Sequence, residues 1–197
     1  MLINEFYKPK ISKPIERVAT DYVTSDQYYV NKFDNLCDSL KKMGWRFLDD
    51  GAYSKVFANS KKNYILKINS SPDKGYATYV NLIHKYRNKH FPKISDLKQI
   101  EFQGSAYYVY LIEKLEHIPS PMDDEWSFEI SKIADEPTEP LEKLFMIQIP
   151  AFLIKNPSIV KAAKLIGYNM GDNYLDINRN NIMRRSDGTI VITDPYS

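Results

Sequence analysis

Short stretches of alternating apolar and polar positions dominate the first half of the chain. Residues 45–69 are predicted to form three strands, with turns at Asp49–Gly51 and Asn59–Asn63. A helix is expected over 76–90, and Gly104 separates the two strands expected after it. The predicted order is therefore three strands, one helix and two strands.

Helical spacing appears on both sides of these strands. Apolar residues recur every three or four positions within 26–43, and Gly44 is expected to end this helix. A final hairpin is expected around Ser186–Gly188. Beyond Glu113 the same helical spacing predicts three helices, over 124–135, 139–149 and 156–168.

A β-rich first half followed by a helical second half predicts an α+β fold with two lobes. We expect an N-terminal arm and helix over residues 1–43, a β-rich lobe over 44–115 and a helical lobe over 116–197. A chain of 197 residues can bury about 70% of its unfolded surface, so a hydrophobic core is expected.

Composition and charge narrow the classes of partner. Lys and Arg number 27 and Asp and Glu 25, so a net charge of +2 does not require an acidic partner. The first residues carry charges and prolines where a secretory signal would be apolar, and the lone Cys37 cannot form an internal disulfide. We therefore expect a cytoplasmic protein that binds neither membrane nor nucleic acid.

The histidines do not suggest a catalytic or metal site. His84, His90 and His117 do not cluster with one another or with Cys37. We expect them to be surface or partly buried side chains.

Oxygen-bearing side chains gather near the end of the sequence. Asn181 follows Asp176 by five positions, and Asp194 follows Asn181 by thirteen. Because the two ends of a short hairpin lie close together, we expect all three side chains to face one space. Such oxygen ligands are typical of Mg²⁺, which is bound by one or two carboxylates plus substrate phosphates. A purely polar turn explains Asp194 poorly, since a carboxylate after a buried strand is costly unless it is paired or metal-bound.

Two further candidates lie in the predicted strands. Gly51 is expected in a tight turn, where backbone N–H groups could approach an anion. Lys67 lies between apolar neighbours, where its charge could hold the phosphates of a nucleotide. The alternatives are an ordinary turn glycine and a lysine at the edge of the sheet.

Taken together, these stretches resemble the eukaryotic-like protein kinase superfamily. "LDDGAYSKVF" is similar to its glycine-rich loop, and "ILKI" to the strand that carries the phosphate-binding lysine. "YLDINRNN" is similar to the catalytic loop and "ITDP" to the metal-binding D-F-G. The similarity is closer still to the early serine/threonine protein kinases of podovirus-type coliphages, the T-seven group. It covers residues 43–115 and 165–197.

The resemblance implies a two-lobed, protein-kinase-like fold with a minimal, truncated helical C-lobe and a site for ATP and Mg²⁺. Asp176 would be the catalytic base, Asn181 and Asp194 would hold Mg²⁺, and Lys67 would contact the phosphates. The remaining ATP-binding residues would be Gly51, Ala52, Tyr53, Ser54 and Val56 in the loop, with Glu113 and Leu115 in the hinge segment.

The sequence departs from the kinase pattern at several positions. Asp49 and Ser54 stand where the loop usually has glycines. The helix after Lys67 contains no acid, so we expect this lysine to pair with Asp194 alone. The sequence ends three residues after Asp194, which predicts a minimal or degenerate kinase.

The leading hypothesis is an ATP-dependent protein kinase that phosphorylates Ser or Thr of host proteins, or of itself. By the resemblance, it would be a phage protein in the host cytoplasm, and the host transcription machinery is a candidate target. Two alternatives stay open: a pseudokinase that binds and inhibits a host protein, and a small-molecule phosphotransferase of the aminoglycoside or choline kinase kind.

Overall fold

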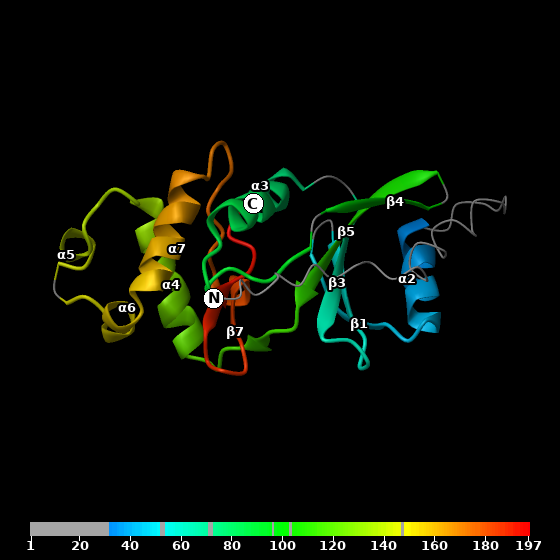
Figure 1. Cartoon of the computed structure of the whole chain (residues 1–197), viewed down its shortest axis with the longest axis horizontal. Coiled ribbons are helices and arrows are strands. Elements are labelled where there is room, and N and C mark those ends of the chain that lie inside the picture. Colours follow the sequence, from blue (N-terminus) through cyan, green and yellow to red (C-terminus); the bar gives the residue numbers. More distant parts are fainter. Residues whose placement is uncertain (1–31, 52–53, 71–72, 96, 103, 147) are drawn as a thin grey trace, which may run out of the picture. The chain divides into compact units, whose positions relative to one another are not determined.

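The computed structural model divides into two compact units (Figure 1). The first contains the described residues up to Asp73 together with Lys93–Lys114, and the second contains Lys74–Pro92 and Leu115–Ser197. One unit is rich in strands and the other in helices, which confirms the predicted α+β fold. The structure describes residues 32–51, 54–70, 73–95, 97–102, 104–146 and 148–197.

The first unit is built on a five-stranded antiparallel sheet with the order β1-β2-β3-β5-β4. The central strand β3 pairs with β2 on one side and with β5 on the other. Gly104, with a φ of 71°, makes the tight turn between β4 and β5. The predicted strands are therefore present: β1 (Arg46–Asp50), β2 (Ser54–Ala58), β3 (Tyr64–Asn69), β4 (Lys98–Phe102) and β5 (Ser105–Glu113).

Helix α2 (Lys32–Lys42) packs its apolar side against the core of this unit. Leu36 and Leu40, one helical turn apart, are buried in one cluster with residues of the sheet such as Phe57. The helix ends as predicted before Gly44, whose φ of 83° is unfavourable for other residues. The predicted start of the helix, over 26–31, lies outside the described residues.

The second unit combines helices with a three-stranded antiparallel sheet, β6-β7-β8. Helices α4 and α7 lie side by side (Figure 1), and Gly167 permits their close approach. A Cβ at this position would lie 1.9 Å from the carbonyl oxygen of Ala134. The elements are α3 (Lys74–Tyr86), β6 (Glu116–His117), α4 (Met122–Asp135), α5 (Leu141–Leu144), α6 (Ala151–Lys155), α7 (Pro157–Tyr168), β7 (Ile182–Arg184) and β8 (Ile190–Ile192).

Two predicted helices are corrected by the structure. The helix expected over 76–90 ends at Tyr86, because Arg87 adopts a φ of 43°. The helix expected over 139–149 is limited to Leu141–Leu144. Pro150 disfavours a helical conformation in the residue before it, and the separate helix α6 begins after it.

No helix in the described ranges combines the length and the apolar character needed to cross a lipid bilayer.

Candidate functional site

Asp176 and Asn181 are joined by hydrogen bonds within the second unit. The Nδ2 of Asn181 donates to the backbone carbonyl of Asp176 at 2.6 Å and to its Oδ2 at 3.3 Å. The Oδ1 of Asp176 accepts from the Nδ2 of Asn178 at 2.8 Å. Both oxygens of this partly exposed carboxylate are therefore oriented by asparagine side chains.

The sequence of this loop explains its conformation. A short 3₁₀ helix, η1 (Arg179–Asn181), begins after Asn178, whose side chain accepts from the backbone N–H of Asn180 at 2.8 Å. Asn178 is not among the site residues expected from the sequence, and its bond to Asp176 is a contact that sequence reasoning missed. Because the amide group carries both an acceptor and a donor, one side chain caps η1 and orients the carboxylate.

Asp194 lies between two residues that bind the same loop. The N–H of Thr193 donates to the carbonyl of Asn181 at 2.8 Å, and the carbonyl of Pro195 accepts from the N–H of Asp176 at 2.8 Å. The two bonds hold the backbone on both sides of Asp194 next to Asn181 and Asp176. The structure therefore brings these three predicted residues together.

The hairpin responsible for this arrangement is the predicted one, with small shifts at its ends. Pairing of Ile182 with Ile192 joins β7 to β8 and brings the flanking segments together. Asn181 ends η1 and does not start the strand, and Asp194 follows the end of β8 by two residues. The chain continues along the loop after Asp194, with Leu175 bridged to Tyr196.

The oxygen donors of this cluster fit Mg²⁺. The amide nitrogen of Asn181 is engaged by Asp176, so its amide oxygen is the atom that can coordinate a cation. The carboxylate of Asp194 offers a second hard ligand, and Mg²⁺ bound by one or two protein groups takes its other ligands from phosphates and water. Among the described residues, no three or more His, Cys, Asp or Glu side chains come together in a cluster that could hold a metal ion.

Lys67 lies in the first unit, on the central strand β3. It is 7% exposed and stands opposite Val56 of β2 and Tyr110 of β5. This location excludes the alternative of a lysine at the sheet edge. Its pairing with Asp194 stays a prediction, because the two residues belong to different units.

The candidate loop residues lie between β1 and β2 in the same unit. The N–H of Gly51 donates to the carbonyl of Ser54 at 2.9 Å. The turn predicted over Asp49–Gly51 is therefore displaced along the chain, because Asp49 and Asp50 belong to β1. Val56 stands opposite Asp49 of β1 and Lys67 of β3. Ala52 and Tyr53 lie outside the described residues.

The candidate hinge residues lie where the two units divide, between Lys114 and Leu115. Glu113 is the last residue of β5, and its N–H donates to the carbonyl of Lys93 at 2.9 Å. Its side chain accepts from the N–H of Lys93 at 2.8 Å. The N–H of Glu113 is therefore already engaged, and a hydrogen bond from Glu113 to adenine would need its other backbone group, the carbonyl. The role of Leu115 stays a prediction.

The prediction of surface or partly buried histidines is wrong for His90, which is 1% exposed. Its Nδ1 lies 2.7 Å from the carbonyl oxygen of Ile190, and its Nε2 lies 2.9 Å from the Oγ of Ser158. Because a carbonyl can only accept, Nδ1 carries the proton and Nε2 accepts from the hydroxyl. Burial lowers the pKa of His90, so the ring is neutral near pH 7.

No protein-family model matches the chain, and no curated protein matches it. A solved structure of the spectinomycin phosphotransferase APH(9)-Ia, in complex with ADP and spectinomycin, matches at 13% identity with a TM-score of 0.40. This match covers 75% of the chain and 62% of that protein. The streptomycin–ATP–APH(2″)-IIa ternary complex matches at 15% identity with a TM-score of 0.35, over 86% of the chain and 73% of that protein. Both TM-scores are below 0.5, and neither similarity carries a functional conclusion for this chain.

Proposed function

We propose that this protein is a phosphotransferase with a kinase-like active site, which transfers the γ-phosphate of ATP to a hydroxyl group. The observation that supports the proposal is the hydrogen-bonded pair of Asp176 and Asn181, next to which two backbone hydrogen bonds hold the segment that carries Asp194. A catalytic carboxylate and two oxygen ligands are the groups that phosphoryl transfer requires at the acceptor and at the metal.

Each residue of the cluster has a distinct role in this proposal. Asp176 accepts the proton of the acceptor hydroxyl, and its two fixed hydrogen bonds orient the carboxylate for that transfer. Asn181 and Asp194 hold Mg²⁺ through their oxygen atoms. When bound there, Mg²⁺ would neutralise charge on the phosphates. The contact of Lys67 with the phosphates stays a prediction from the sequence.

The acceptor is the finer part of the proposal. The sequence resemblance favours Ser or Thr of a host protein. The alternative of a small-molecule hydroxyl has the same chemistry, and the two solved structures named above are complexes with antibiotics. Both acceptor classes therefore belong in the test.

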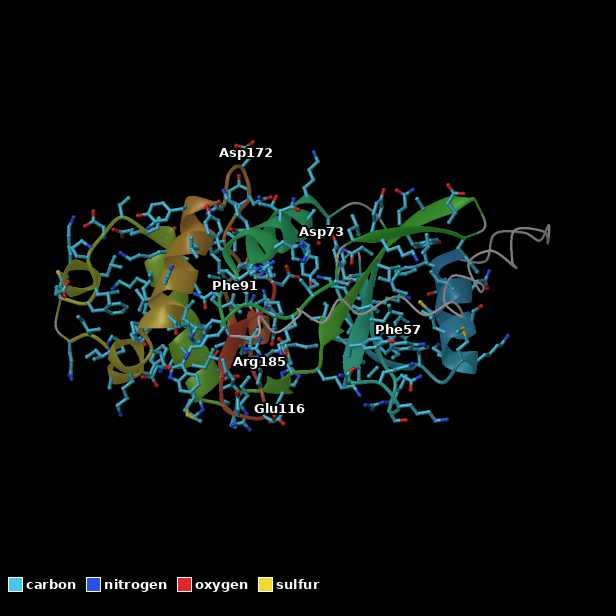
Figure 2. All side chains as sticks on the ribbon, in the orientation of Figure 1. Phe57, Asp73, Phe91, Glu116, Asp172 and Arg185 are labelled. Atoms are coloured by element: carbon cyan, nitrogen blue, oxygen red, sulfur yellow. The ribbon has the colours of Figure 1, made fainter. Side chains whose placement is uncertain are left out.

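The test is phosphate transfer from γ-labelled ATP in the presence of Mg²⁺, with a bacterial lysate in one arm and aminoglycosides and spectinomycin in the other. Asp176→Asn should lower the rate by about 10²–10⁴-fold, the usual contribution of a general base. Asp172→Asn is the matched control, since this exposed carboxylate, four residues before Asp176 in the connection between α7 and η1, undergoes the same chemical change (Figure 2).

Labelled protein bands would support the protein kinase, and labelled antibiotics would support the small-molecule enzyme. An Asp176→Asn variant as active as wild type would contradict the assignment of the catalytic base. A folded wild type that labels nothing in either arm would favour the pseudokinase and count against the proposed function.

A further inference from the structure

The outer edge of β8 is covered by α3 and by the residues that follow it. β8 pairs with β7 along one edge only. On the other edge, His90 Nδ1 donates to the carbonyl of Ile190, and the N–H of Ile192 donates to the carbonyl of His90 at 2.9 Å. The hydroxyl of Tyr79 on α3 donates to the carbonyl of Ile192. Two side chains and one backbone carbonyl thus take the place of a neighbouring strand.

The segment after α3 is itself tied to the hairpin. The guanidinium of Arg185, which follows β7, donates to the carbonyls of Lys89 and Phe91 (Figure 2). Asn88 donates through Nδ2 to the carbonyl of Ser158 at the start of α7. The covered edge of β8 is therefore held from several directions.

Tyr79 binds Ile192, which lies two residues before the candidate metal ligand Asp194. The side chain of Tyr79 is fully buried, and its ring makes edge contacts with Phe91 and Tyr196 at centroid distances of 5.8 and 6.0 Å. Burial and the nearby charge of Asp194 raise the pKa of the phenol. The hydroxyl is therefore protonated and serves as a donor to its carbonyl partner.

Helix α3 contacts the chain on both sides of Asp194. Tyr79 binds the carbonyl of Ile192, two residues before it, and its ring makes an edge contact with Tyr196, two residues after it. Gly75 supports the second contact, since a Cβ there would lie only 3.2 Å from the Cβ of Tyr196. The backbone that carries Asp194 is thus fixed at two points by one helix.

We propose that Tyr79 is a positioning residue for Asp194, which it holds in place through the carbonyl of Ile192 and the ring of Tyr196. The inference rests on the proposed function where it concerns Mg²⁺, because Asp194 is the carboxylate assigned to the metal. Helix α3 contains no acidic residue and therefore cannot offer a carboxylate for an ion pair. The inference gives this helix a role in the site through Tyr79 instead.

Tyr79→Phe tests this inference, since it removes the hydroxyl and keeps the ring contacts. The first readout is amide hydrogen exchange in the protein without nucleotide. We expect faster exchange in the variant at the amides of Thr193 and Asp176. The N–H of Thr193 donates to Asn181 and the N–H of Asp176 donates to Pro195, so both bonds depend on the backbone next to Asp194. Amides of β3 in the first unit should not change. Tyr168→Phe is the matched control, because it also loses a hydroxyl bond to a backbone carbonyl, that of Pro137.

The second readout is the Mg²⁺ dependence of phosphate transfer. Tyr79→Phe should raise the Mg²⁺ concentration for half-maximal rate by about tenfold, the effect of one lost buried hydrogen bond, and leave the KM of the acceptor unchanged. Tyr168→Phe should match wild type. Unchanged exchange at Thr193 and Asp176, or an unchanged Mg²⁺ dependence, would overturn the inference. An inactive wild type would refute the proposed function, and the exchange result would still decide whether Tyr79 positions this backbone.

Discussion

Glu129 lies on α4 with one carboxylate oxygen, Oε2, buried and without a hydrogen-bond partner among the described residues. Burial and the nearby charge of Glu125 raise its pKa from 4.5 to about 7. A carboxyl group with a raised pKa binds its proton more tightly in the folded state than in the unfolded state. Its contribution to stability is present below about pH 4.5 and is lost as the pH rises through about 7.

We therefore predict that Glu129→Gln is more stable than wild type at about pH 8, and that this advantage shrinks at about pH 5. The amide carries no charge at either pH, so it does not pay the cost of a buried carboxylate. Urea unfolding of both proteins at the two pH values measures the difference in free energy of unfolding. An equal difference at both values would show that Glu129 does not titrate between them.

Single residues also show where sequence reasoning succeeds and where it fails. Asp176, Asn181 and Asp194 could be predicted as a group because one short hairpin brings them together. The burial of His90 could not, because its partners Ser158 and Ile190 are distant in sequence. No local pattern around a histidine encodes a hydrogen bond of this kind.

At the scale of elements, the contact between α4 and α7 depends on a residue without a side chain. A Cβ on Gly167 would overlap the backbone carbonyl of Ala134, which cannot move away as a flexible side chain could. We predict that Gly167→Ala lowers the free energy of unfolding by at least about 1–3 kcal/mol, although alanine favours helices. Chemical denaturation provides the measurement, and a variant as stable as wild type would contradict the close packing of these helices.

The strands of the first unit could be predicted because alternation and turn residues such as Gly104 are local signals. The short strand β6 could not, since two residues carry no periodicity and their partner β7 lies far along the chain. The prediction of a helix over 139–149 was also wrong. Its apolar spacing is helical, but α5 ends at Leu144 and the next helix, α6, begins only after Pro150.

At the scale of the whole molecule, the candidate residues are distributed over two units. The first holds Lys67 and the turn at Gly51, and the second holds Asp176, Asn181 and Asp194. The phosphate and Mg²⁺ chemistry stays a prediction from the residue types, because Asp, Asn and Lys have well-defined roles toward these groups. The contacts of Tyr79 with Ile192 and Tyr196 could not be predicted from the sequence, since they depend on tertiary packing.

The central claim is that Asp194 and Asn181 hold Mg·ATP, and Mg²⁺-dependent stabilisation by ATP tests it most directly. ATP at about 100 times its Kd should raise the free energy of unfolding of wild type by about 2.7 kcal/mol in Mg²⁺, and by much less in EDTA. Asp194→Asn should lose the Mg²⁺-dependent part, whereas the exposed Asp172→Asn should keep it. No Mg²⁺-dependent stabilisation of wild type, or full stabilisation of Asp194→Asn, would contradict the account.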